Sequence, residues 1–134
     1  MAPSKTDLLP ISSSTDVVLI RQKVRTWAVE LGFSLVDQTK MITAASELAR
    51  NSLDYGGGGT VRFETVENGV KRGLRLTFED QGPGIPDIDL ALTDGYTTGK
   101  GMGLGLGGAK RLVNTFEIAS RPGEGTRVTI TRWK

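Results

Sequence analysis

The chain of 134 residues contains neither cysteine nor histidine, and 17 basic against 15 acidic residues give it a formal net charge of +2. The lack of cysteine excludes disulfides, thiolate nucleophiles and cysteine-ligated metals. The lack of histidine means that any general base must be a carboxylate or a lysine of depressed pKa. Any metal must then be a hard cation bound by oxygen, and magnesium is the leading candidate.

Composition and segment pattern indicate one soluble domain. Hydrophobic residues make up 37% of the chain and charged residues 24%, and no apolar stretch approaches the roughly 20 residues that span a bilayer. Residues 1–14 lack the basic start and apolar core of a signal peptide. We therefore expect a flexible N-terminal arm over 1–14, a single domain over 15–134, a cytoplasmic location and no membrane partner. Basic and acidic residues are interspersed, which argues against a nucleic-acid partner.

The first predicted helix follows the arm. Thr15 or Asp16 can cap it, and Gly32 ends it. Apolar residues recur between them at helical spacing, namely Val17, Ile20, Val24, Trp27, Ala28 and Leu31. This stripe is expected to face the core, and Trp133 near the other end of the chain is expected to pack in the core or at its edge.

A second helix is predicted from near Ser34 to Tyr55. Asp37 follows Ser34 by three residues, in an arrangement like a capping box. The side chains expected to point toward the core are Val36, Ile42, Ala45, Leu48 and Ala49. The run Gly56–Gly59 then predicts a flexible turn from helix to strand.

The second half of the chain begins with a predicted β-hairpin. Residues 60–66 and 74–80 alternate apolar and polar side chains, and a turn at 67–69 joins them. A stretch rich in proline and aspartate follows, with a short helical piece expected over 89–93.

A glycine-rich segment comes next, with seven glycines between positions 95 and 108. Ordering so many glycines is entropically costly, so a mobile loop that closes on a ligand is expected here. A helix over 106–116 and strands over 117–121 and 126–133 complete the pattern. The element order predicts an α/β two-layer sandwich, with a mixed or antiparallel sheet and helices on one face.

The turn after the second strand of the hairpin is a candidate ligand site. Asp80-Gln81-Gly82-Pro83-Gly84-Ile85 places a carboxylate beside two glycines directly after an apolar alternating run. Glycines permit unusual backbone angles and let a ligand approach the main chain. A tight surface turn with an incidental aspartate is the alternative interpretation of this hexapeptide.

A second candidate group lies on the second helix. Glu47 and Asn51 are four residues apart, so both project from one face with a carboxylate beside an amide. Their neighbours Leu48 and Ala49 are expected to face the core, which leaves the pair at the edge of a cleft. A solvated pair of polar side chains is the alternative.

The chain carries, in this order, the motifs Glu47-X-X-X-Asn51, Asp80-X-Gly82-X-Gly84 and Gly101-X-Gly103-X-Gly105. Together they resemble the N, G1 and G2 boxes of the GHKL ATPases, the superfamily of gyrase, Hsp90, histidine kinases and MutL. The resemblance covers nearly the whole chain and implies a Bergerat fold. Residues 46–51, 79–88 and 123–126 are most similar to the RsbT-type serine/threonine switch kinases and anti-sigma factors of bacteria.

This resemblance implies a role for each matching position, with ATP and Mg²⁺ as cofactors. Asp80 would accept a hydrogen bond from the adenine amino group, and Thr126 would support the same edge. Asn51 would bind magnesium through its amide oxygen, and Glu47 would act as the catalytic base. The remaining positions implied to contact the nucleotide are Gly82, Gly84, Ile85, Thr97, Thr98, Lys100, Gly101, Gly103, Leu104 and Gly105. For Thr97, Thr98 and Lys100, simple solvation is an alternative role.

The resemblance leaves more than one function open. An ATP-dependent protein serine/threonine kinase of a stressosome-type partner-switching pathway would phosphorylate STAS-domain proteins and then activate a PP2C-type phosphatase by binding. An anti-sigma factor would instead bind a sigma factor with an affinity set by nucleotide. The short chain argues against the ATPase of a larger machine.

Overall fold

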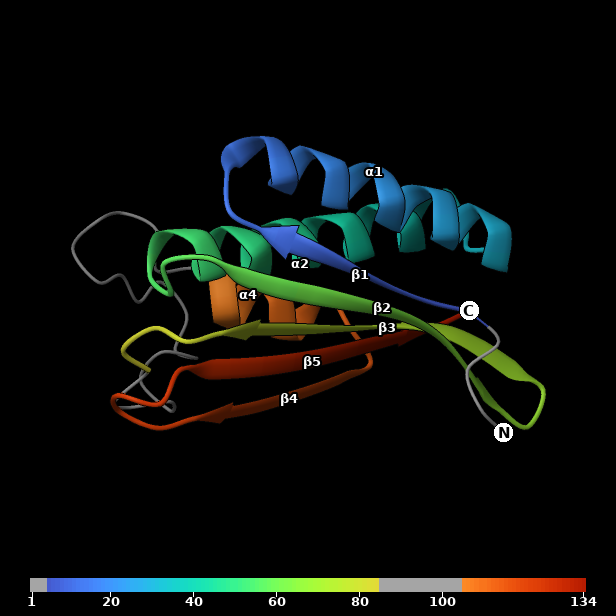
Figure 1. Cartoon of the computed structure of the whole chain (residues 1–134). Coiled ribbons are helices and arrows are strands. Elements are labelled where there is room, and N and C mark those ends of the chain that lie inside the picture. Colours follow the sequence, from blue (N-terminus) through green and yellow to red (C-terminus); the bar gives the residue numbers. More distant parts are fainter. Residues whose placement is uncertain (1–4, 85–104) are drawn as a thin grey trace.

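The computed structural model describes residues 5–84 and 105–134. In this part of the chain five strands form one sheet in the order β1-β2-β3-β5-β4, and every neighbouring pair is antiparallel. Figure 1 shows the helices on one face of the sheet. The elements are β1 Thr6–Ile11, α1 Ser14–Leu31, α2 Leu35–Asp54, β2 Gly59–Asn68, β3 Lys71–Asp80, α4 Gly105–Arg111, β4 Thr115–Ser120 and β5 Thr126–Trp133. The predicted two-layer sandwich is confirmed, and its sheet is antiparallel in the described part.

The prediction of a flexible arm over 1–14 is wrong for residues 6–11. These residues form β1, the edge strand that pairs with β2 from Thr6 opposite Glu64 to Ile11 opposite Gly59. Ile11 is buried, and Leu9 packs against the core from the same side of the strand. Burial of alternate side chains against the helices therefore orders a segment whose short apolar pattern gave little signal by itself.

α1 begins earlier than predicted and ends where predicted. Its N-cap is Ser13, whose side-chain oxygen accepts the N–H of Asp16 at 3.3 Å. Asp16 is not the cap of this helix. Its carboxylate instead accepts the N–H of Ser12, just before the helix, at 2.8 Å. Gly32 ends the helix with φ 86°, a left-handed angle that favours glycine. All six residues of the predicted apolar stripe are buried.

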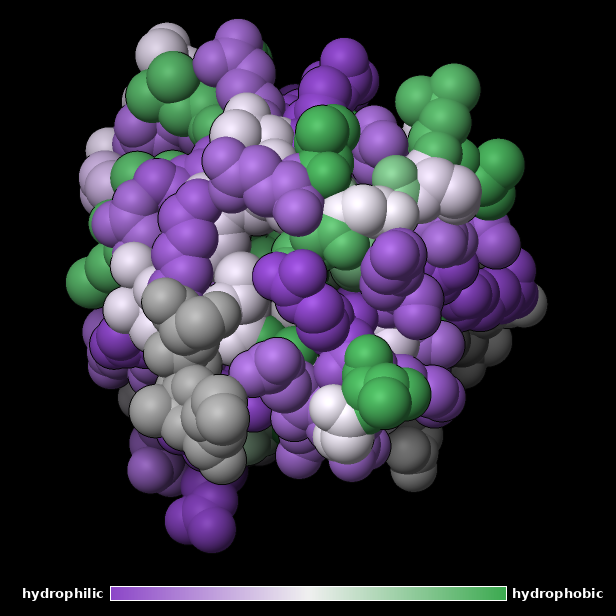
Figure 2. Space-filling view, turned by 90° about the vertical axis from the view of Figure 1, so that its right-hand side faces the viewer, coloured by the Kyte–Doolittle hydropathy of each residue, from purple (hydrophilic) through white to green (hydrophobic). Residues whose placement is uncertain are grey.

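α2 is capped by Ser34 as predicted, with the Asp37 N–H 3.1 Å from the Ser34 side-chain oxygen. The last helical residue is Asp54, and Tyr55 is the C-cap. The prediction that Val36 faces the core is wrong, because this residue lies in the first turn on the solvent side with 62% exposure. Figure 2 shows an end of the molecule where hydrophobic residues are scattered over a mostly hydrophilic surface. Isolated apolar side chains of this kind are normal on soluble proteins.

The predicted hairpin is confirmed, with Gly69 in the turn at φ 64°. The helix predicted over 106–116 is too long, since α4 ends at Arg111 and Phe116 belongs to β4. Pairing of Phe116 with Ile130 on β5 explains why the apolar residue continues a sheet and not a helix. The helical piece expected over 89–93 and the mobile loop expected before residue 105 lie outside the described residues.

The core lies between the helices and the covered face of the sheet. Trp27 is 4% exposed and stacks at a tilt on Phe63 of β2, with 5.4 Å between ring centroids, which confirms its predicted core role. Trp133 is half-buried at the end of β5, and its ring lies against Gly73 on β3. Among the described residues, none of the helices combines the length and the apolar character needed to cross a membrane.

Candidate functional site

Asp80 is the last residue of β3, between the ends of two neighbouring strands. It lies opposite Gly59 on β2 and opposite Thr126 on β5. The Gly82 N–H donates to its Oδ1 at 2.9 Å. Burial raises the pKa of the Asp80 carboxyl, whereas the backbone N–H groups of Gly82 and Thr126 act to lower it. The result is a partly desolvated carboxylate that backbone donors hold in place.

Two glycines enclose this carboxylate. A Cβ atom placed on Gly56, just after α2, would lie 2.3 Å from Asp80 Cγ. A Cβ atom on Gly82 would lie 2.5 Å from the Cα atom of Gly56. The turn that follows Asp80 therefore packs main chain against main chain on the end of α2, which only glycine permits.

The connection between β4 and β5 closes the other side of the turn. Gly84 has φ 79°, and a Cβ atom there would lie 2.0 Å from the carbonyl oxygen of Arg121. The Gly123 N–H donates to the carbonyl oxygen of Pro83 at 2.6 Å. Gly125, with φ 83°, lies against the carbonyl oxygen of Asp80. Asp80 is thus held between the C-terminal end of α2 and this connection.

Thr126 is held by Ser120, a residue that sequence analysis did not identify. The Ser120 hydroxyl donates to the carbonyl oxygen of Gly125 at 2.9 Å, and its oxygen lies 2.8 Å from Thr126 Oγ1. Because a hydroxyl carries one hydrogen, the Thr126 hydroxyl is the donor to Ser120. Its own lone pairs remain available to accept a hydrogen bond.

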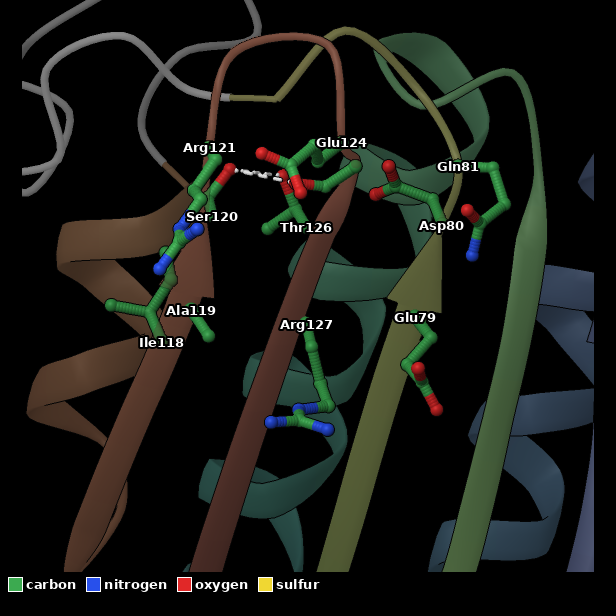
Figure 3. Close-up of a pocket in the computed structure, with 11 residues that line it drawn as sticks. Glu79, Asp80, Gln81, Ile118, Ala119, Ser120, Arg121, Glu124, Thr126 and Arg127 are labelled. Atoms are coloured by element: carbon green, nitrogen blue, oxygen red, sulfur yellow. Dashed lines mark hydrogen bonds between the residues drawn. The ribbon is translucent and has the colours of Figure 1, made fainter.

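Asp80 and Thr126 line one cavity of about 440 Å³ at the ends of β3, β5 and β4. Figure 3 shows Asp80, Thr126, Ser120 and Glu124 gathered at the strand ends, with Arg127 and Glu79 farther down the strands. Asp80 and Thr126, which are predicted to recognise the same edge of a base, therefore line the same cavity. Gly82 and Gly84 belong to the same turn.

Glu47 and Asn51 lie on α2 and do not line this cavity. Both are half-buried, while Leu48 and Ala49 beside them are buried, as expected for residues at the edge of the core. The carbonyl oxygen of Asn51 accepts the N–H of Gly56 at 3.3 Å. The backbone therefore links Asn51 directly to the glycine that touches Asp80.

Other predicted site residues lie outside the described part of the chain. They are Ile85, Thr97, Thr98, Lys100, Gly101, Gly103 and Leu104. Gly105 is the first residue of α4. Within the described residues, histidine, cysteine, aspartate and glutamate form no group of three or more that could hold a metal ion by itself.

The predicted flexible turn at Gly56–Gly59 is ordered by close packing. Gly58 lies against the carbonyl oxygen of Ile11, and Gly59 against that of Glu79, whereas a Cβ atom on Gly57 would meet nothing within 4 Å. Sequence analysis could recognise the glycines but not their contacts, because the partners lie far away along the chain.

Comparison with protein families identifies the family to which this chain belongs. The family model described as histidine kinase-, DNA gyrase B-, and HSP90-like ATPase matches residues 36–134. The chain belongs to this ATPase family. Asp80, Thr126, Glu47 and Asn51 all lie within the matched region of the ATPase domain.

Two relatives of this ATPase domain are similar over most of their length. The serine/threonine-protein kinase RsbT of Bacillus subtilis is 47% identical over 123 residues, which is 92% of each chain. An anti-sigma F factor of Clostridium kluyveri is 29% identical over 126 residues, covering 91% of this chain and 89% of the relative.

Solved structures support the fold of the ATPase domain. The structure of the RsbU and RsbW domains of Rv1364c from Mycobacterium tuberculosis matches with a TM-score of 0.68 at 20% identity, over 98% of this chain and 34% of that chain. The mycobacterial sensor histidine kinase MprB matches with a TM-score of 0.56 at 21% identity, over 96% of this chain and 97% of that one. The predicted GHKL-type sandwich is confirmed.

Proposed function

We propose that the chain is an ATP-dependent protein serine/threonine kinase of a bacterial partner-switching pathway of the stressosome type. One observation carries the proposal. α2 bears the carboxylate of Glu47 and the amide of Asn51, and Gly56, which directly follows its C-cap, lies against the enclosed carboxylate of Asp80. The proposed general base and the proposed metal ligand thus lie on one helix, and the proposed acceptor for the nucleobase lies next to the C-terminal end of that helix. The 47% identity to a serine/threonine-protein kinase over 92% of both chains supports the same function.

In this proposal the cavity at the strand ends receives the adenine base. Asp80 accepts a hydrogen bond from the exocyclic amino group, and Thr126 contributes its free lone pairs to the same edge. The backbone donors that hold the carboxylate fix its direction before the ligand arrives, which reduces the entropy lost on binding. Gly82 and Gly84 pack this turn against the main chain of Gly56 and Arg121 and are proposed to contact the base through their own main chain, and Ile85 would pack against the base.

Asn51 is the proposed protein ligand of Mg²⁺. An ion held by one amide oxygen, by phosphate oxygens and by water fits a site without a cluster of carboxylates, because Mg²⁺ retains several waters. When bound, the ion would neutralise charge on the phosphates. The remaining proposed phosphate contacts are Thr97, Thr98, Lys100, Gly101, Gly103, Leu104 and Gly105.

Glu47 is the proposed general base. Its carboxylate would take the proton from a serine or threonine hydroxyl of the substrate protein while the hydroxyl oxygen bonds to the γ-phosphorus. The bond from the γ-phosphorus to the bridging oxygen breaks, and ADP leaves. With no histidine in the chain, a carboxylate is the residue type available for this step near the proposed metal.

The proposed substrates are STAS-domain proteins, and the proposed output partner is a PP2C-type phosphatase that the kinase activates by binding. A cytoplasmic location goes with this pathway. The alternative is an anti-sigma factor whose sigma binding depends on nucleotide, and the 29% identity to an anti-sigma F factor favours it as the second candidate.

The test is to incubate the protein with Mg-ATP and a candidate STAS protein and to follow acid-stable phosphate. We expect transfer by the wild type, loss of transfer by Glu47→Ala, and ATP binding retained by that variant. No transfer by the wild type, or undiminished transfer by Glu47→Ala, would overturn the kinase proposal. A stable complex with a sigma factor, found in a pull-down that recovers no STAS protein, would favour the alternative.

A further inference from the structure

Gly56 occupies a position where any side chain would collide with the carboxyl group of Asp80. We propose that Gly56 is a positioning residue that fixes this carboxylate and thereby sets the preference of the site for adenine over guanine. The inference rests on the proposed role of Asp80 in reading the base. Gly56 itself touches no ligand in this scheme and acts through Asp80.

The three atoms nearest to a Cβ atom on Gly56 all belong to the side chain of Asp80. A Cβ atom on Gly56 would lie 2.3 Å from Asp80 Cγ, 2.6 Å from Asp80 Cβ and 2.6 Å from Asp80 Oδ2. Separations below about 3 Å are far inside van der Waals contact, so one of the two groups must move. Rotation of the Asp80 side chain can move Cγ and Oδ2 out of the overlap, but Asp80 Cβ is fixed by the main chain, so the end of β3 must shift as well. Either movement displaces the carboxyl group.

The main chain at Gly56 is held in place and cannot yield as easily. Its N–H donates to the carbonyl oxygen of Asn51 at 3.3 Å, and the N–H of Gly58 donates to that of Ser52 at 2.8 Å. On its other side, the main chain of Gly56 packs against Gly82. An added methyl group at position 56 would therefore displace the Asp80 carboxylate from its present position, in which the N–H of Gly82 holds Oδ1.

The position of this carboxylate decides which base is accepted. Adenine presents an amino group that donates to a carboxylate, whereas guanine presents a carbonyl oxygen at the same ring position, and two acceptors repel each other. A displaced carboxylate loses both the attraction and the repulsion. Substitution of Gly56 should consequently weaken ATP binding and reduce the discrimination against GTP, by roughly tenfold or more in the ratio of the two dissociation constants.

Gly57 provides a matched control. It has φ +74°, so an alanine there would be strained, yet its Cβ atom would meet nothing within 4 Å. No left-handed angle occurs at Gly56. Gly57→Ala should therefore lower the melting temperature and leave the ratio of ATP to GTP affinity unchanged. Gly56→Ala should lower the ratio, so the two variants separate loss of fold from loss of positioning.

The experiment measures dissociation constants for ATP and GTP by calorimetry on the full chain, together with thermal melting. Asp80→Gly, which removes the three nearest overlapping atoms, is combined with Gly56→Ala in a double-mutant cycle. We expect Gly56→Ala to reduce the ATP to GTP preference in the wild type and to change nothing further in the Asp80→Gly background. If Gly56→Ala alone folds poorly, the double variant should recover its melting temperature.

Two results distinguish failure of this inference from failure of the proposed site. If Asp80→Gly binds both nucleotides as the wild type does, Asp80 does not read the base and the proposed site is wrong. If Asp80→Gly loses the preference while Gly56→Ala keeps it, the proposed site stands and the role of Gly56 is overturned. An equal effect of Gly56→Ala in both backgrounds would also overturn it, because the effect would then not pass through Asp80.

Discussion

Arg132 on β5 binds Asp37 in the first turn of α2, with 2.6 Å between Arg132 Nη2 and Asp37 Oδ1. Its Nη1 donates to the carbonyl oxygen of Leu112, just after α4, at 2.8 Å. The arginine side chain is 15% exposed and the aspartate 28%. The guanidinium group of Arg132 thus links the start of α2 and the segment just after α4 to β5.

The first prediction concerns the stability that this guanidinium provides. Arg132→Ala should lower the free energy of unfolding by about 2 kcal/mol, because a shielded carboxylate and a carbonyl oxygen both lose their donor. Arg132→Lys should recover only part of it, since a single ammonium group cannot reproduce the planar fork. Urea denaturation measures the effect. The control is Glu30→Ala, which removes an exposed ion pair with Lys5 and should change stability by less than about 0.5 kcal/mol.

The second prediction is the pH dependence of this contact. The hydrogen bond from Arg132 holds the pKa of Asp37 below its ordinary value. A carboxyl group whose pKa is lowered by folding contributes stability above its unfolded pKa, near 3.9 on average, and the contribution disappears as pH falls through the folded pKa. Wild type should therefore lose stability below about pH 4 more steeply than Asp37→Asn. If the free energies of unfolding of the two proteins fell equally steeply below this pH, the prediction would be contradicted.

The sequence correctly predicted those helix boundaries that depend on residues close together in the chain. Ser34 and Gly32 bound the helices as expected, because a cap side chain and a left-handed glycine act within a few residues of the chain. β1 and Phe116 were wrongly assigned, since their state depends on pairing with strands more than ten residues away.

The residues of the candidate site likewise fall into those that the sequence could predict and those that it could not. The motif around Asp80 could be predicted from its spacing, whereas Gly56 and Ser120 could not. Gly56 is 24 positions from the carboxylate that it touches, and no pattern in the sequence marks that contact. Ser120 is an ordinary strand residue until β4 pairs with β5 and brings its hydroxyl to Thr126.

The third prediction tests Ser120. Ser120→Ala removes the hydroxyl that bonds both the carbonyl oxygen of Gly125 and the side chain of Thr126. Thr126 then loses its fixed direction, and ATP affinity should fall several-fold, equivalent to about 1 kcal/mol, without a change in phosphoryl transfer from bound ATP. Glu117→Ala, an exposed change on the same strand, is the control for stability of the sheet edge. A fall in transfer rate at saturating ATP with unchanged affinity would contradict the prediction.

The fourth prediction separates binding from transfer by pH. Burial raises the pKa of Asp80, so this carboxyl is protonated at a higher pH than an exposed aspartate. A protonated carboxyl no longer offers two free acceptors to the adenine amino group, and ATP affinity should decline as pH falls, beginning above the range in which exposed aspartates titrate. Asp80→Asn should bind ATP roughly tenfold more weakly and lose this pH dependence, since its amide does not titrate.

Glu47→Ala should keep both the affinity and its pH dependence while transfer stops. Calorimetric titrations of the three proteins from neutral pH down into the acid range, corrected for protonation of ATP itself, would measure this. A pH dependence as steep in Asp80→Asn as in the wild type would show that another group controls binding.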